Sequence, residues 1–114
     1  MTDRLIHDGQ VAVLYSPGFG AGWSTWANSL DVEQSLVAER MIFDPQIADL
    51  VDRRADGWQA QVEAVATLKY PNAYLGGLET LQVEWLPVGT QFRIVEHDGD
   101  ETIETRDSVD WITA

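Results

Sequence analysis

Residues 16–26 read Ser-Pro-Gly-Phe-Gly-Ala-Gly-Trp-Ser-Thr-Trp, and their composition is typical of loops that bind something. Glycines at alternate positions permit positive φ and let a ligand approach backbone N–H groups closely. Aromatic rings offer faces for stacking, and serine hydroxyls can donate hydrogen bonds. The candidate binding residues in this loop are Ser16, Gly18, Phe19, Gly20, Gly22, Trp23, Ser24 and Trp26.

The glycine spacing matches neither common phosphate-binding motif. A P-loop requires a lysine directly after its last glycine, and no lysine occurs before Lys69. A dinucleotide fingerprint would place its third glycine where this chain has Trp23, and no βαβ unit follows. Two interpretations remain open. Either the loop recognises a ligand or partner, or its tryptophans anchor it to the core. Tyr74, beside a second glycine pair, either lies in a turn or completes the same pocket.

Groupings of residues that perform catalysis or hold metals are scarce. The chain has no cysteine and only two histidines, His7 and His97, which is a poor basis for a zinc site. It has no Gly-x-Ser-x-Gly nucleophile elbow, and the acidic run at 96–101 lacks the EF-hand spacing. We therefore expect a non-enzymatic protein without a cofactor or metal.

The charge balance is the strongest bulk signal. Nineteen acidic residues face seven basic ones, for a formal net charge of −12. Such a field repels nucleic acid and anionic membranes and steers the protein toward basic surfaces, although it also serves solubility alone. If the acidic face is functional, we expect Asp49, Asp52 and Asp56 to contact a basic partner. The chain has no apolar run near 18 residues and no signal-peptide pattern at its start, so we expect a cytoplasmic protein.

Several elements are predicted in the first two thirds of the chain. Residues 11–15 are a continuous apolar run, typical of a buried strand. Asp31 with Gln34 resembles a capping box before a short helix. Asp44-Pro45 predicts the start of a helix over 45–53, and a second periodic stretch predicts a helix over 58–69.

The last third has the two-residue period of strands. Strands are predicted at 81–85, from about residue 91, and at 102–105, and Val109 and Trp111 extend or repeat the last. Asp98-Gly99 predicts a tight hairpin turn. Residues 1–114 are therefore expected to form a single α+β domain. It would have an N-terminal strand, two to three short helices on one face of the sheet, and a C-terminal antiparallel β-meander.

Three segments carry a resemblance: residues 15–23, Phe43-Asp44-Pro45, and the run from Trp85 to Ile94. Together they resemble small uncharacterised acidic proteins of phages and prophages. The resemblance spans most of the chain and brings no established activity. It implies a small accessory protein that acts against host defences, as anti-CRISPR-like proteins do. Some small acidic phage proteins block the nucleic-acid-binding surface of a host protein, and others sequester nucleotide signals.

The expected function is therefore a binding or inhibitory one, with an acidic surface docked on a basic host protein. The alternative is a module that binds or sequesters a small, nucleotide-like ligand through the loop at 16–26. An uncharacterised enzyme is the third possibility. Charge favours the first, because a phosphate-rich ligand needs compensating cations and the chain has only seven.

Overall fold

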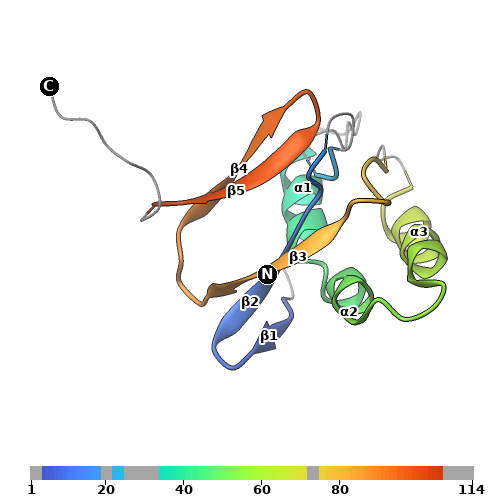
Figure 1. Cartoon of the computed structure of the whole chain (residues 1–114), viewed down its shortest axis with the longest axis horizontal. Helices are drawn as coiled ribbons and strands as arrows, with labels where there is room; N and C mark the ends of the chain where they lie inside the picture. Colours follow the sequence, from blue (N-terminus) through green and yellow to red (C-terminus); the bar gives the residue numbers. More distant parts are fainter. Residues whose placement is uncertain (1–3, 19–21, 25–33, 72–74, 107–114) are drawn as a thin grey trace, which may run out of the picture.

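The computed structural model describes residues 4–18, 22–24, 34–71 and 75–106. Helices and antiparallel strands occur together, so the predicted α+β class is confirmed (Figure 1). The elements are β1 (Ile6–His7), β2 (Gln10–Tyr15), α1 (Gln34–Phe43), α2 (Pro45–Arg53), α3 (Trp58–Lys69), β3 (Gln82–Pro87), β4 (Phe92–His97) and β5 (Asp100–Thr105).

Strand β2 is the centre of the fold because both of its faces are buried. Ala12 and Leu14 lie in the core formed with α2 and α3, whereas Val11 and Val13 pack with the end of α1 and the β4–β5 hairpin. The continuous apolar run at 11–15 was correctly predicted as a buried strand. The expectation of helices on one face alone is incomplete, because Phe43 of α1 packs on the second face.

The predicted meander is wrong in its pairing. Strand β3 pairs antiparallel with β2 from Gln10–Pro87 to Tyr15–Gln82, giving a sheet of order β1-β2-β3. Strands β4 and β5 form a separate two-stranded sheet. The physical reason lies in the two apolar faces of β2. β3 continues the sheet beside β2, and the β4–β5 hairpin leaves that sheet to cover the second face (Figure 1).

Both tight hairpins use an Asp-Gly turn with two positive φ angles. Asp98 and Gly99 have φ of 50° and 86°, which confirms the predicted hairpin between β4 and β5. Asp8 and Gly9 have φ of 52° and 76° and join β1 to β2. The second hairpin went unpredicted although the same dipeptide marks it.

Two of the helices begin and end as predicted. The Asp44 carboxylate accepts a hydrogen bond from the Ile47 amide (3.0 Å), and Pro45 occupies the first helical position of α2. Helix α3 spans 58–69 and ends before Pro71, as predicted. Helix α1 starts at Gln34, and the predicted cap at Asp31 lies outside the described residues, as do Val109 and Trp111.

A buried cluster around Asp44 ties the start of α2 to the end of α3. The Tyr70 hydroxyl donates to Asp44 Oδ2 (2.7 Å), and Lys69 Nζ lies 3.2 Å from both carboxylate oxygens. Burial, and then the hydrogen bond to Asp44 and its charge, raise the pKa of Tyr70 far above its usual value near 10. Tyr70 therefore stays neutral and acts as a donor to the carboxylate.

The hairpin turn gives a first prediction. Gly99→Val forces a β-branched residue to positive φ, and we expect a loss of stability of roughly 1 kcal/mol or more. That loss corresponds to a fall of several degrees in melting temperature. Gly99→Asn, which tolerates positive φ, should retain most of the stability. A melting temperature unchanged by the valine substitution would contradict the turn geometry.

The raised pKa of Tyr70 gives a second prediction. The unfolded chain ionises this tyrosine above about pH 10, whereas the folded protein keeps it neutral. The stability it contributes is therefore present below pH 10 and lost as pH rises, by at most about 1.4 kcal/mol per pH unit. We expect the free energy of unfolding of the wild type to fall more steeply above pH 10 than that of Tyr70→Phe. Equal slopes in urea titrations would refute this.

Candidate functional site

The start of the glycine-rich loop is held by one buried carboxylate. Glu101 of β5 is completely buried, and its Oε1 accepts from the Ser16 amide (3.0 Å) and the Ser16 hydroxyl (3.3 Å). Its Oε2 accepts from the Ser24 amide (3.1 Å). Both carboxylate oxygens are thus satisfied, as a buried charge requires.

Every backbone N–H that the structure describes within this loop points to an acceptor of the chain itself. Pro17 has no N–H, and the other five described residues are all bonded internally. The pairs are Ser16 and Ser24 to Glu101, Gly18 to Asp100 Oδ1 (2.7 Å), Gly22 to the Gly99 carbonyl (2.7 Å), and Trp23 to Ser16 Oγ (2.8 Å). In this conformation four of these N–H groups attach the loop to the β4–β5 hairpin, and the Trp23 N–H bonds within the loop.

Trp23 is a core residue, which corrects its expected role as a stacking face. Its side chain is fully buried, and its indole N–H donates to the Met41 carbonyl (2.9 Å). Ser16 and Ser24 are buried as well, so their expected role as donors to a ligand is also wrong in this conformation. Phe19, Gly20, Trp26 and Tyr74 lie outside the described residues, and their expected roles stay predictions.

Glu101 is the important residue that sequence reasoning missed. It stands in an acidic run beside an exposed turn and was interpreted as part of that run. Its position in β5 carries a signal, because Ile103 lies two residues further and faces the core. Since side chains alternate along a strand, Glu101 must point to the same inner face.

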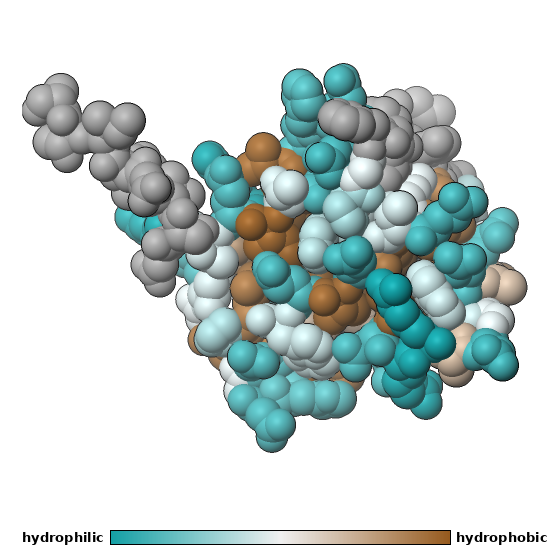
Figure 2. Space-filling view, in the orientation of Figure 1, coloured by the Kyte–Doolittle hydropathy of each residue, from teal (hydrophilic) through white to brown (hydrophobic). Residues whose placement is uncertain are grey.

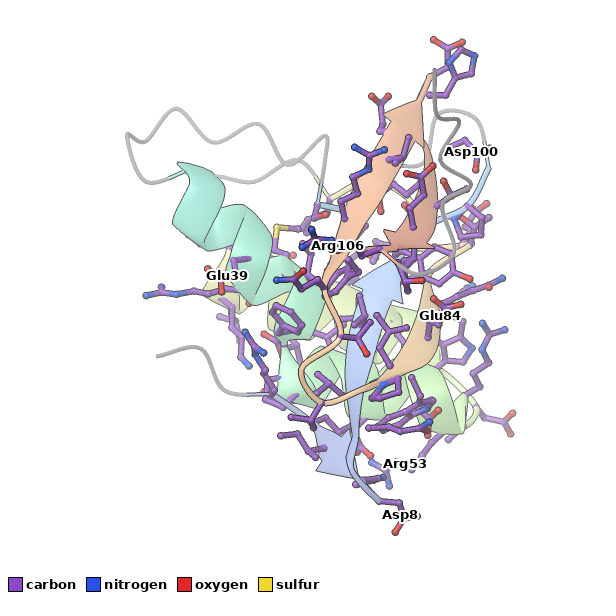
Figure 3. The ribbon with its side chains drawn as sticks, turned by 90° about the vertical axis from the view of Figure 1, so that its left-hand side faces the viewer. Asp8, Glu39, Arg53, Glu84, Asp100 and Arg106 are labelled. Atoms are coloured by element: carbon purple, nitrogen blue, oxygen red, sulfur yellow. The ribbon has the colours of Figure 1, made fainter. Side chains whose placement is uncertain are left out.

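A second candidate site surrounds β3, and we name it the β3 acidic surface: Asp52, Asp56, Glu79 and Glu84. Asp52 accepts from the Trp85 indole N–H (3.2 Å), which places the end of α2 against this strand. Arg54 donates to the Leu81 carbonyl (3.3 Å), which attaches the chain after α2 to the residue before β3; Asp56 and Glu79 are each two residues from one of these partners in sequence. Glu84 lies on the strand itself, at the right-hand side of the molecule in Figure 3.

Trp85 provides an aromatic surface beside these carboxylates. It is partly exposed and stacks on His7 of β1, with ring centroids 5.2 Å apart and planes 18° from parallel. Ala12 lies opposite Trp85 on β2, and its small side chain leaves room for the two rings to meet across the strand. Sequence reasoning proposed neither Trp85 nor His7 for the site.

Most cations are paired away from the β3 acidic surface. Within the described part of the chain, the ion pairs that involve arginine or lysine are Arg4–Glu39, Arg53–Asp49, Lys69–Asp44 and Arg93–Glu104. Of the three aspartates expected to contact a partner, Asp49 is therefore offset by Arg53. Asp52 and Asp56 have no ion pair in the same described part.

The described residues contain no group of three or more histidine, cysteine, aspartate or glutamate side chains that could hold a metal ion. Nor does any helix within these ranges have the length and apolar character to cross a membrane. Comparisons with protein-family models, with curated proteins and with solved structures gave no significant match. The site must therefore be interpreted from its own geometry.

The buried carboxylate gives a third prediction. Glu101→Ala would leave the Ser16 and Ser24 amides without their acceptor, and we expect a loss of roughly 3 kcal/mol in the free energy of unfolding. Glu104→Ala, on the same strand but in an exposed pair with Arg93, should cost at most about 1 kcal/mol. Similar losses in urea denaturation of the two variants would contradict the assigned role of Glu101.

Proposed function

We propose that the protein is a non-enzymatic binding or inhibitory protein that docks through the β3 acidic surface on a basic surface of another protein. The observation that supports this most strongly is the local excess of acidic over basic residues. Asp52 bonds to Trp85 of β3, Glu84 lies on the strand, and Asp56 and Glu79 are close in sequence to the Arg54–Leu81 contact, where Arg54 is the cation among the described residues that bonds. A basic surface would complement this charge.

The position of Trp85 supports the same proposal. Interfaces depend on a few large aromatic anchors that are surrounded by polar residues, and Trp85 is partly exposed beside Asp52. Figure 2 shows one face of the molecule on which hydrophobic side chains gather and hydrophilic ones surround them. That arrangement resembles the apolar centre and polar rim of protein interfaces.

The kind of partner follows from charge. A net charge of −12 opposes binding to nucleic acid or to an anionic membrane, and it speeds encounter with a basic protein. Proteins with basic surfaces include those that bind nucleic acid, and an acidic protein can occupy such a surface in its place. The resemblance to small phage and prophage proteins favours a counter-defence role in the host cytoplasm.

The small-ligand alternative receives no support from the described part of the loop at 16–26. It required N–H groups that a ligand could approach, and the five described ones bond to the chain itself. We therefore do not advance it as a second function.

The experiment is an affinity capture from a bacterial lysate at low and high salt, with mass spectrometry of the captured proteins. We expect basic proteins that dissociate as ionic strength rises past about 0.1 M, where the Debye length is about 10 Å. The triple variant Asp52→Asn, Asp56→Asn and Glu84→Gln should weaken capture.

A matched control removes the same charge elsewhere, with Glu39→Gln, Glu63→Gln and Asp98→Asn. This control should capture as the wild type does. Equal losses in the two triple variants would show a general charge effect and refute docking at the β3 acidic surface, as would capture that is insensitive to salt.

A further inference from the structure

Among the residues that the structure describes, one edge of the three-stranded sheet is open along β3. The Val88 amide donates to the Gly9 carbonyl (2.8 Å), which continues the register of the β2–β3 ladder by one pair. In an antiparallel ladder, hydrogen-bonded pairs alternate with non-bonded ones. Gln82, Glu84 and Leu86 therefore bond to β2, and Val83 and Trp85 direct their N–H and C=O groups away from it.

These outward groups have no partner in the part of the chain that the structure describes. Strand β3 is the last strand in the order β1-β2-β3, and no hydrogen bond within the described ranges reaches the backbone of Val83 or Trp85. The opposite edge strand, β1, is only two residues long. At β5, by contrast, the Glu101 amide is covered by the Ser16 carbonyl (3.0 Å). With respect to the described residues, the N–H and C=O groups of Val83 and Trp85 are thus four backbone groups without a partner.

We propose that the edge of β3 binds an extended basic segment of a partner protein as an additional antiparallel or parallel strand. This inference rests on the proposed function and names how the partner is held. Strand addition to an open edge gains backbone hydrogen bonds, and alternate side chains of the added strand supply specificity. The outward groups of Val83 and Trp85 are the docking points.

Charge selects a basic partner strand over a second copy of this chain. Glu84 stands near the middle of β3 and is exposed. Antiparallel pairing of two copies centred there would place Glu84 opposite Glu84 and would bring two charges of −12 together. A lysine or arginine on the incoming strand would instead face Glu84, whereas Asp52 lies on the Trp85 side of β3 and Arg54 is occupied at the Leu81 carbonyl.

The two faces of β3 also define the pattern of the incoming strand. Val83 and Trp85 point their side chains to the helix side of the sheet, where they pack against the core, whereas Glu84 points to the other side (Figure 3). An added strand has the same alternation. It should therefore carry basic residues on the Glu84 side and apolar residues on the Trp85 side.

The test uses three labelled hexapeptides with the sequence Lys-Val-Lys-Val-Lys-Val. One is unmethylated, and each of the other two carries N-methyl groups on alternate residues, in opposite phases. The methyl groups remove the N–H donors of one edge of the peptide and leave its charge unchanged. Titration at low salt should show the unmethylated peptide binding about tenfold more tightly than the copy whose docking edge is blocked, the effect of losing one or two hydrogen bonds. Hydrogen exchange should show the Val83 and Trp85 amides exposed in the free protein and protected in the complex.

Variants at β3 provide the matched comparison. Val83→Pro removes an outward N–H without removing a ladder bond to β2. This variant should bind the unmethylated peptide no more tightly than it binds the methylated copy whose docking edge is blocked. Val83→Thr keeps the N–H and a branched side chain and should bind as the wild type does. Glu84→Lys should bind the Lys-Val peptide weakly and a Glu-Val hexapeptide more tightly than the wild type does.

The outcomes separate this inference from the proposed function. Equal, salt-sensitive binding of all peptides would overturn strand addition and leave the acidic surface supported. No binding of any Lys-Val peptide would overturn the inference, and the lysate capture would still decide the proposed function. A wild-type dimer in sedimentation that Val83→Pro converts to monomer would overturn it in favour of a second copy. If Val83→Pro fails to fold, the methylated peptides and the amide exchange still decide.

Discussion

The buried carboxylate of Glu101 is the interaction on which the arrangement of the second half of the fold depends. A charge inside a protein is costly unless hydrogen bonds surround it, and here the Ser16 hydroxyl and the amides of Ser16 and Ser24 do so. Those bonds join the chain after β2 to β5, although the two are 85 positions apart in sequence. They hold the β4–β5 hairpin beside β2 and turn the start of the glycine-rich loop toward the molecule.

The position of the hairpin in turn explains why β3 is an edge. Val11 and Val13 of β2 need apolar cover on the face opposite α2 and α3, and the hairpin supplies it with Phe92 and Ile103. A hairpin in that place does not extend the sheet beyond β3. The outer backbone groups of β3 consequently face outward, next to carboxylates that have no ion pair in the described structure.

The same organisation separates structural charge from surface charge. Asp44 and Glu101 are buried acidic groups that bond to amides, hydroxyls or Lys69, and they hold elements together. Asp52 and Asp56, by contrast, have no ion pair in the described structure. A net charge of −12 is thus divided between buried groups that hold elements together and groups on the surface, which composition alone does not reveal.

The sequence by itself determined the elements whose signals are local. Asp44-Pro45 marks the start of α2, Asp98-Gly99 marks the hairpin, and the apolar run at 11–15 marks a strand buried on both faces, because caps, turns and periodicity depend on neighbours within a few residues. Only the tertiary structure decided that β3 pairs with β2, that Trp23 packs in the core and that the buried Glu101 carboxylate bonds to Ser16. Each of these depends on contacts between distant segments, and local residue types leave such contacts undetermined.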